Sequence, residues 1–213
     1  MVDLLSQRHV IKVCAVTTVA DAQLVADAGA DALGVILADS PRRVTLESAA
    51  EICTSVRGRL ARVGVFRHVT YAEVARCLDA VDLDALQIHG GLPDGVAALA
   101  RARGLALIEA LSVTDLDAAS GVGDAYLIDG ARPGSGLAHD WSDVARRSWN
   151  RPIIVAGGLT AESVAAVLAT VDAWGCDVAS GSESSPGVKD RERVESFVRN
   201  ARRYFDDREE HRG

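Results

Sequence analysis

Two residues near the N-terminus have types and spacing suited to proton transfer. Lys12 and Cys14 stand two apart in an apolar run, and residues two apart in a strand share one face, roughly 6–7 Å apart. An ammonium at that distance favours the thiolate and lowers the thiol pKa from about 8.5 toward neutrality, as a general base requires. Alternatively, Cys14 is a small buried hydrophobic residue, which is the common state of a free cysteine.

Asp129 and His89 are further candidates for acid–base chemistry. Asp129 follows the apolar run YLI and precedes a glycine. It is either a loop or cap residue, or a partly buried acid whose pKa is raised by desolvation so that it donates a proton near pH 7. His89, in the segment LQIHGG, is either a site residue or a hydrogen-bonded structural group. Position alone leaves both questions open.

Two glycine turns suggest a phosphate site. One apolar strand runs into Gly157-Gly158, and a second short strand runs into Ser180-Gly181. Turns without bulky side chains that lead into helix N-termini expose backbone N–H groups, which bind anions. If both turns open at the same end of a parallel βαβ unit, they can hold one phosphate between them.

Two neighbouring arginines could bind a second anionic group. Arg42 and Arg43 stand in the segment DSPRRV, in the loop after the second predicted strand. A guanidinium fork suits a carboxylate of a substrate. Either side chain could equally be a solvated loop arginine.

A regular alternation of short apolar runs and amphipathic stretches must position these residues. The apolar runs predict eight strands, at 10–16, 32–37, 61–66, 85–88, 105–110, 125–128, 153–156 and 177–179. A helical pattern follows each of them, at 19–28, 46–56, 71–80, 96–103, 114–119, 141–148, 161–171 and 191–205. Because parallel neighbours need a crossover connection, this alternation predicts a parallel sheet.

Eight strand–helix units predict an α/β fold of one closed (β/α)₈ TIM barrel of the phosphate-binding type. We expect a single domain over residues 1–213, with 207–213 as a frayed helix end. A doubly wound open sheet is the alternative, but the first turn, CAVTTVAD, lacks the G-x-G-x-x-G of a dinucleotide site. In such a barrel the reactive groups stand at the carboxyl ends of the strands, where Cys14, His89, Asp129 and the glycine turns fall.

Composition excludes several classes of function. The 213 residues carry a net charge of −7 with scattered acidic residues, unlike the basic surface of a nucleic-acid binder. The four cysteines are far apart in the sequence, which indicates neither a zinc cluster nor a disulfide framework. The first residues, MVDLLSQRH, lack the cationic start and apolar core expected of a signal peptide, and no apolar run approaches the length that spans a bilayer. We therefore expect a cytoplasmic protein that binds neither nucleic acid nor membrane.

Along nearly its whole length the chain resembles the phosphoribosylanthranilate isomerase family of tryptophan biosynthesis. The matching segments are, in order, KVCAVT, DSPRRV, VGVF, LQIHG, YLID, PGSG with HDW, IIVAGGLTAESV and DVASGSESSPGVKD. The resemblance implies a single (β/α)₈ barrel that isomerises N-(5-phosphoribosyl)anthranilate to 1-(2-carboxyphenylamino)-1-deoxyribulose 5-phosphate. It implies an Amadori rearrangement without cofactor or metal, on a small phosphorylated ribosyl amine, by a monomer or homodimer.

The resemblance also implies roles for individual residues. The general base falls on Cys14 and the general acid on Asp129. Arg42 falls on the arginine that the family uses toward the anthranilate carboxylate. Lys12 and His89 accompany them as substrate-site residues. The phosphate-binding backbone falls on Gly157, Gly158, Ser180 and Gly181.

Several positions depart from the family pattern. Ala15 replaces a glycine after the cysteine, Pro133 replaces a glycine in PGSG, His139 replaces a phenylalanine in HDW, and Ala179 and Ser182 alter the last phosphate segment. These departures cluster around the non-phosphate half of the expected substrate. Two alternatives therefore stand beside the isomerase: a related ribosyl-phosphate isomerase with another amine, and a barrel that binds ligand without turnover.

Overall fold

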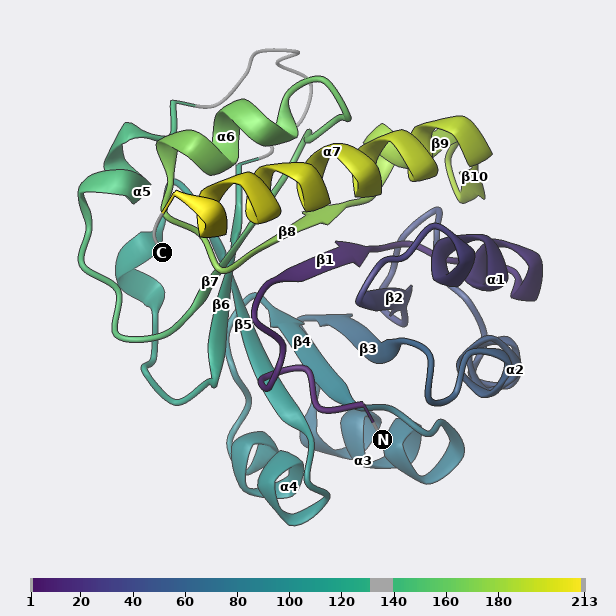
Figure 1. Ribbon diagram of the computed structural model, residues 1–213. Coiled ribbons are helices and arrows are strands. Elements are labelled where there is room, and N and C mark those ends of the chain that lie inside the picture. The colour runs from purple at the N-terminus through teal and green to yellow at the C-terminus, as the bar shows by residue number, and fades with distance from the viewer. Residues whose placement is uncertain (1, 131–139, 212–213) are drawn as a thin grey trace.

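The computed structural model describes residues 2–130 and 140–211. Eight parallel strands follow one another in chain order and close into a barrel, because β1 pairs with both β2 and β8 (Figure 1). The strands are β1 (Val10–Val13), β2 (Ala32–Ile36), β3 (Ala61–Arg67), β4 (Ala85–His89), β5 (Ala106–Ser112), β6 (Ala125–Asp129), β7 (Ile153–Ala156) and β8 (Gly175–Val178). The predicted TIM barrel is confirmed, and the open sheet is excluded.

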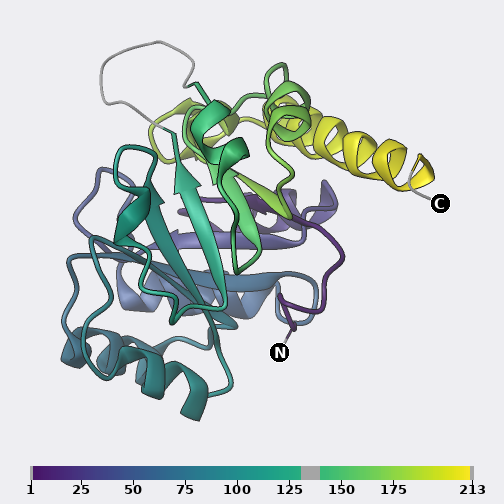
Figure 2. The same cartoon turned by 90° about the vertical axis from the view of Figure 1, so that its left-hand side faces the viewer.

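Helices surround the barrel. They are α1 (Val19–Asp27), α2 (Leu46–Ser55), α3 (Tyr71–Ala80), α4 (Val96–Ala102), α5 (Ser142–Arg146), α6 (Val164–Thr170) and α7 (Arg191–Glu210). The first three begin after threonine N-caps whose side chains accept a backbone hydrogen bond, which stabilises the strand-to-helix turns at the barrel mouth. Helices α6 and α7 pack side by side, and the last turns of α7 extend beyond the barrel in Figure 2.

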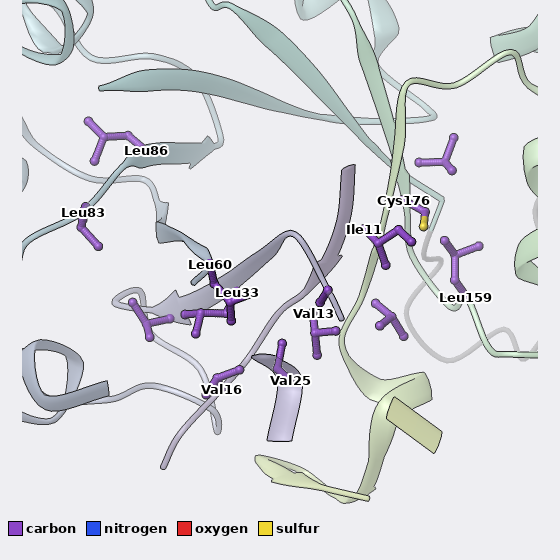
Figure 3. Close-up of a cluster of buried hydrophobic side chains, with 14 of the residues drawn as sticks. Ile11, Val13, Val16, Val25, Leu33, Leu60, Leu83, Leu86, Leu159 and Cys176 are labelled. Carbon is purple, nitrogen blue, oxygen red and sulfur yellow. The ribbon is translucent and has the colours of Figure 1, made fainter. Parts of the chain in front are cut away.

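The apolar side chains form two separate layers. One fills the space between barrel and helices, and Figure 3 shows part of it around β1, with Ile11, Val13 and Val25 among the labelled side chains. The other fills the barrel interior and is built mainly from small residues such as Ala32, Ala61 and valines. This division follows from the period-two alternation of a strand. It leaves room inside the barrel for longer polar side chains.

Strand β1 shows how this alternation places the first candidate residues. Ile11 and Val13 belong to the outer layer, whereas Val10 and Cys14 belong to the inner one. Lys12 therefore points inward between Val10 and Cys14, and its side chain is fully buried. The strand ends at Val13, three residues before the predicted end, because Ala15 adopts a left-handed backbone with φ of 63°.

Three predicted helices differ from the structure. The pattern at 114–119 forms only a 3₁₀ turn, Leu116–Ala118, because a six-residue segment with one large apolar side chain, Leu116, offers little to bury against the barrel. The helix expected at 141–148 is reduced to α5. The helix expected from 161 begins at Val164, after a turn in which the Ser163 N–H donates to the Thr160 carbonyl.

The chain between β8 and α7 holds an unpredicted hairpin. A 3₁₀ turn, Ser180–Ser182, is followed by two short antiparallel strands, β9 (Glu183–Ser185) and β10 (Val188–Lys189). The hairpin lies outside the closed barrel. At the other end of this segment, α7 continues to Glu210, four residues into the stretch expected to fray.

Candidate active site

One pocket at the carboxyl ends of the strands gathers most of the predicted site residues. It has a volume of about 300 Å³. The predicted residues that line it are Cys14, Arg42, His89, Asp129, Gly157, Gly158 and Ser180. Lys12 lies beneath the pocket and Gly181 lines a neighbouring hollow. Residues from six strands or their loops thus converge on one space.

Lys12 pairs with an acid from the neighbouring strand. Its Nζ lies 2.9 Å from Asp177 Oδ2, because β1 and β8 are registered with Lys12 beside Asp177. The contact is an ion pair outside hydrogen-bond geometry: Lys12 Nζ and Asp177 Oδ1 have no hydrogen-bond partner among the described residues. Gly34 makes space for this group, since a Cβ there would lie 2.7 Å from Cys14 Sγ and 3.1 Å from Lys12 Nζ.

The sequence-based expectation of a thiol pKa near neutrality is wrong for the free protein. Burial raises the pKa of Cys14 above its ordinary value, and the Asp177 carboxylate adds to this; Lys12 and Lys189 oppose both. Burial also acts to lower the pKa of Lys12, but Asp177 and Cys14 outweigh it and leave that pKa raised. The ammonium is therefore charged, and the thiol beside it retains its proton near pH 7.

Asp129 and His89 stand on neighbouring parts of the same rim. Asp129 ends β6, half-buried. His89 ends β4, and its Nε2 lies 2.8 Å from the side-chain amide nitrogen of Gln87. Burial, with Arg67 and Lys12 nearby, lowers the pKa of His89 to about 4. The imidazole is therefore neutral at physiological pH and binds through hydrogen bonds rather than charge.

Arg42 is held by an acid that sequence analysis did not single out. Its Nε lies 2.9 and 3.0 Å from the two carboxylate oxygens of Glu183, and its Nη2 lies 2.7 Å from Oε2. The other arginine of the pair, Arg43, is exposed and does not line this pocket. The structure therefore separates the two candidates: Arg42 faces the pocket, and Arg43 is a surface loop residue.

The two glycine turns differ in backbone conformation and in the space around them. Gly157 and Gly158 have φ of 89° and 68°, a left-handed conformation that favours glycine. A Cβ on Gly158 would meet nothing within 4 Å, whereas a Cβ on Gly181 would lie 1.9 Å from the Leu159 carbonyl oxygen. Gly181 is thus required to pack the β8 turn against the β7 turn, and Gly158 is the position where an added side chain would enter open space.

The positive helix end expected at 161 lies elsewhere. Helix α6 is seven residues long and starts at Val164, three residues later than expected. The turn before α6 still lines the hollow beside the glycine turns, together with the 3₁₀ turn and the first turns of α7; the lining residues are Gly158, Thr160, Ala161, Glu162, Ser180, Gly181, Asp190, Glu192, Arg193 and Ser196. The hollow therefore holds one cationic side chain, Arg193, and three acidic ones, Glu162, Asp190 and Glu192.

The family departures fall in different places. Ala15 is fully buried and carries the left-handed backbone described above, which explains why a glycine suits that position. Ala179 lines the pocket, and Ser182 is buried beside it, where its hydroxyl donates to the Ala179 carbonyl at 2.7 Å. Pro133 and His139 lie outside the described residues.

Asp177, Glu183 and Lys189 are the site residues that sequence reasoning missed. Asp177 carried a signal, since an acid inside a buried strand is rare unless it is paired. Glu183 and Lys189 stand in the segment DVASGSESSPGVKD, where the glycine turn was the feature that suggested a ligand. The described residues hold no group of three or more His, Cys, Asp or Glu placed to bind a metal ion. They also include no helix long and apolar enough to cross a bilayer.

Comparison with known proteins identifies the family. A model of the N-(5'-phosphoribosyl)anthranilate (PRA) isomerase family matches residues 11–200. The chain belongs to this family. An N-(5'-phosphoribosyl)anthranilate isomerase of Rubrobacter xylanophilus is 39% identical over 198 residues, which cover 88% of this chain and 96% of the relative.

Solved structures of family members agree with the fold. The phosphoribosyl anthranilate isomerase of Thermus thermophilus is 35% identical, with a TM-score of 0.75 and coverage of 89% of this chain and 96% of that one. A second phosphoribosyl anthranilate isomerase was solved in complex with reduced 1-(o-carboxyphenylamino)-1-deoxyribulose 5-phosphate. It is 29% identical, with a TM-score of 0.78 and coverage of 91% and 98%.

Proposed function

We propose that this protein isomerises N-(5'-phosphoribosyl)anthranilate to 1-(2-carboxyphenylamino)-1-deoxyribulose 5-phosphate. Membership of the isomerase family supports this function. The observation that carries it is the single pocket in which a thiol, a carboxyl group, an arginine and the glycine turns meet. These are the groups that an acid–base isomerisation of an anionic phosphosugar requires.

Ring opening is assigned to Asp129. Its carboxyl group, at the end of β6, gives a proton to the ribose ring oxygen as the bond from that oxygen to C1′ breaks. The lone pair of the amine nitrogen forms the C1′=N bond, so the product is a cationic iminium. The acid thereby becomes a carboxylate next to this cation, which stabilises it.

Proton removal from C2′ is assigned to Cys14. The sulfur takes the proton as a thiolate, and the electrons of the C–H bond form the C1′=C2′ bond of an enolamine. Tautomerisation then protonates C1′ and gives the ketone. Lys12 favours the thiolate, and the iminium formed by ring opening adds a second positive charge beside the sulfur. The pKa of the thiol is therefore lower when the intermediate is present than in the free protein.

The remaining groups of the pocket bind and orient the substrate. The turns at Gly157-Gly158 and Ser180-Gly181 are proposed to hold the phosphate through backbone N–H groups. Arg42 is proposed to bind the anthranilate carboxylate. Neutral His89 is proposed to contact the sugar through a hydrogen bond. Holding the substrate at both ends fixes C2′ between acid and base, which lowers the entropic part of the barrier.

The two alternatives raised by the sequence are not favoured. Arg42 lines the pocket and suits the carboxylate of anthranilate, so no observation calls for another amine. A barrel without turnover would be expected to lack the acid or the base, but Asp129 and Cys14 both line it. The cytoplasmic location and the monomeric or homodimeric state stay predictions.

A direct assay tests this function. Turnover of N-(5'-phosphoribosyl)anthranilate by the purified protein is followed through the change in substrate fluorescence. The wild type should turn over, and Asp129→Asn should lose about 10²–10⁴-fold in kcat, because the amide has the shape of the acid but cannot deliver its proton. Absence of turnover in the wild type, with product analogue still bound, would overturn the proposed function and leave the non-catalytic barrel or an isomerase of another amine.

A further inference from the structure

Glu183 contacts the arginine of the pocket from outside the pocket. Its carboxylate lies against the edge of the guanidinium formed by Nε and Nη2 of Arg42, at distances of 2.7 to 3.0 Å. Arg42 lines the pocket and Glu183 does not. The side chain of Glu183 is 3% exposed, against 23% for Arg42. Glu183 therefore holds the guanidinium from behind.

This contact leaves the opposite edge of the guanidinium available. A guanidinium has five N–H donors in one plane. Glu183 engages Nε and one hydrogen of Nη2, and Nη1 of Arg42 makes no hydrogen bond to any described residue. The edge formed by Nη1 and the outer hydrogen of Nη2 can therefore donate two hydrogen bonds to a second carboxylate, in bidentate geometry.

Lys189 sets the net charge of the group that it forms with Arg42 and Glu183. Its Nζ lies 3.4 Å from Glu183 Oε1, 3.0 Å from Ser182 Oγ and 3.3 Å from the Ala179 carbonyl oxygen. Burial alone would raise the pKa of Glu183, but Arg42 and Lys189 reverse this and leave it lowered, so the carboxylate is ionised. One negative and two positive side chains give a net charge of +1. Without Lys189, Arg42 and Glu183 would cancel and attract an anion weakly.

The same contacts join two distant loops. Arg42 follows β2 and Glu183 follows β8, 141 positions later in the sequence. The hairpin that carries Glu183 is anchored in turn, because the Thr17 hydroxyl donates to the Gly187 carbonyl at 2.6 Å. A long arginine side chain held in this way loses less conformational entropy when it binds a ligand.

We propose that Glu183 and Lys189 are positioning residues that make Arg42 a receptor for a carboxylate on the amine half of the substrate. Glu183 orients the guanidinium, and Lys189 keeps the three-residue group cationic. This inference rests on the proposed function and extends it to the origin of substrate specificity.

The test compares two substrates that differ only in the carboxylate: N-(5'-phosphoribosyl)anthranilate and N-(5'-phosphoribosyl)aniline. The measured quantity is the ratio of their kcat/KM values. Glu183→Gln should lower this ratio about tenfold, mainly through KM of the carboxylated substrate, because a charged hydrogen-bond partner of Arg42 is lost. Lys189→Gln should lower the ratio about threefold. The matched control, Glu51→Gln on the exposed face of α2, should leave it unchanged.

Equal losses on both substrates, which leave the ratio unchanged, would assign Glu183 a merely structural role and overturn the inference, as would no loss on either substrate; each result leaves the proposed function standing. If Glu183→Gln does not fold, Lys189→Gln decides by the same ratio. If the wild type turns over neither substrate, the proposed function fails. The affinities of the reduced product analogues with and without the carboxylate then decide the inference, with the same tenfold loss of discrimination expected in Glu183→Gln.

Discussion

The two ends of the barrel each bury a charged pair, and the pairs are built differently. Near the amino ends of the strands, Arg62 is 1% exposed and donates to Asp84 at 2.7 and 2.9 Å and to Asp82 at 2.8 Å. Beneath the pocket, Lys12 lies 2.9 Å from Asp177, with Lys12 Nζ and Asp177 Oδ1 lacking hydrogen-bond partners among the described residues. Each guanidinium nitrogen of Arg62 makes a hydrogen bond to a carboxylate, whereas Lys12 Nζ makes none to the described residues.

The difference separates a structural pair from a functional one. All three guanidinium nitrogens of Arg62 bind carboxylates, and Arg62 does not line the pocket, so we interpret this group as one that stabilises the fold. Lys12 acts on the thiol of Cys14 as well as on Asp177. At this barrel, burial of a charge is therefore a weak sign of function, and an incompletely satisfied buried charge at the carboxyl end is a stronger one.

Arg62→Met should give the largest change. It leaves Asp84 buried without its cation, and removal of one partner of a buried pair costs about 3–5 kcal/mol of unfolding free energy. Chemical denaturation measures this loss. The kcat of the fraction that remains folded should be unchanged. A strong fall in kcat at full folding would show that the lower end of the barrel also tunes the site.

Lys12→Met should reduce activity more than it reduces stability, the opposite of Arg62→Met. Loss of the ammonium removes the group that favours the Cys14 thiolate, so kcat/KM should fall by about 30-fold, or roughly 2 kcal/mol. Denaturation of the same variant shows whether the fold tolerates the change. If Lys12→Met unfolded the protein as readily as Arg62→Met and the folded fraction kept full activity, the two pairs would be equivalent and the comparison would fail.

The pH dependence of turnover should reflect the raised pKa of Cys14. A base acts only when deprotonated, so kcat/KM, which reports the free enzyme, should rise with pH from 7 to 9 by up to about tenfold per unit. The rise of kcat with pH should occur at lower pH than the rise of kcat/KM, because the cationic intermediate favours the thiolate of Cys14. A plateau in kcat/KM already reached below about pH 8 would contradict the assignment.

Two variants of one glycine test the phosphate turns. Asn and Asp both tolerate the left-handed backbone of Gly158, and the position opens onto free space. They differ only in charge. Gly158→Asp should raise KM about tenfold more than Gly158→Asn, because its carboxylate repels the phosphate at contact range. Equal KM values would place the phosphate elsewhere.

The smallest effect is expected from Ala15→Gly. Glycine relieves the left-handed strain at this position, worth about 1–2 kcal/mol. It also loses a buried methyl group, about 0.8 kcal/mol, and gains unfolded-state entropy, about 0.5–1 kcal/mol. Thermal unfolding should therefore show a change below about 1 kcal/mol. A loss above 2 kcal/mol would mean that the methyl group is needed to pack the turn.

The sequence predicted the barrel and the rim of the pocket because both are local in pattern. Strand runs and their following turns place Cys14, His89, Asp129 and the glycines at one end without knowledge of the tertiary contacts. The predicted helix at 114–119 was wrong. A local pattern as short as this one has too few apolar positions to decide between a helix and a turn.

Partners brought together by barrel closure could not be predicted in this way. Lys12 meets Asp177 only because β1 pairs with β8, and Arg42 meets Glu183 across two loops far apart in the sequence. The predicted pKa of the Cys14 thiol was wrong for the same reason. The sequence shows the cation two residues away, but it does not show the burial of the thiol or the carboxylate that β8 brings beside it.

The most direct test of the account is Cys14→Ala, measured for turnover and for binding of the reduced product analogue. The thiol is assigned to proton removal and not to binding. The variant should therefore bind the analogue within about threefold of the wild type and lose about 10³-fold or more in kcat. If it kept more than about a tenth of the wild-type kcat, a loss under 1.4 kcal/mol of transition-state stabilisation, Cys14 could not be the base.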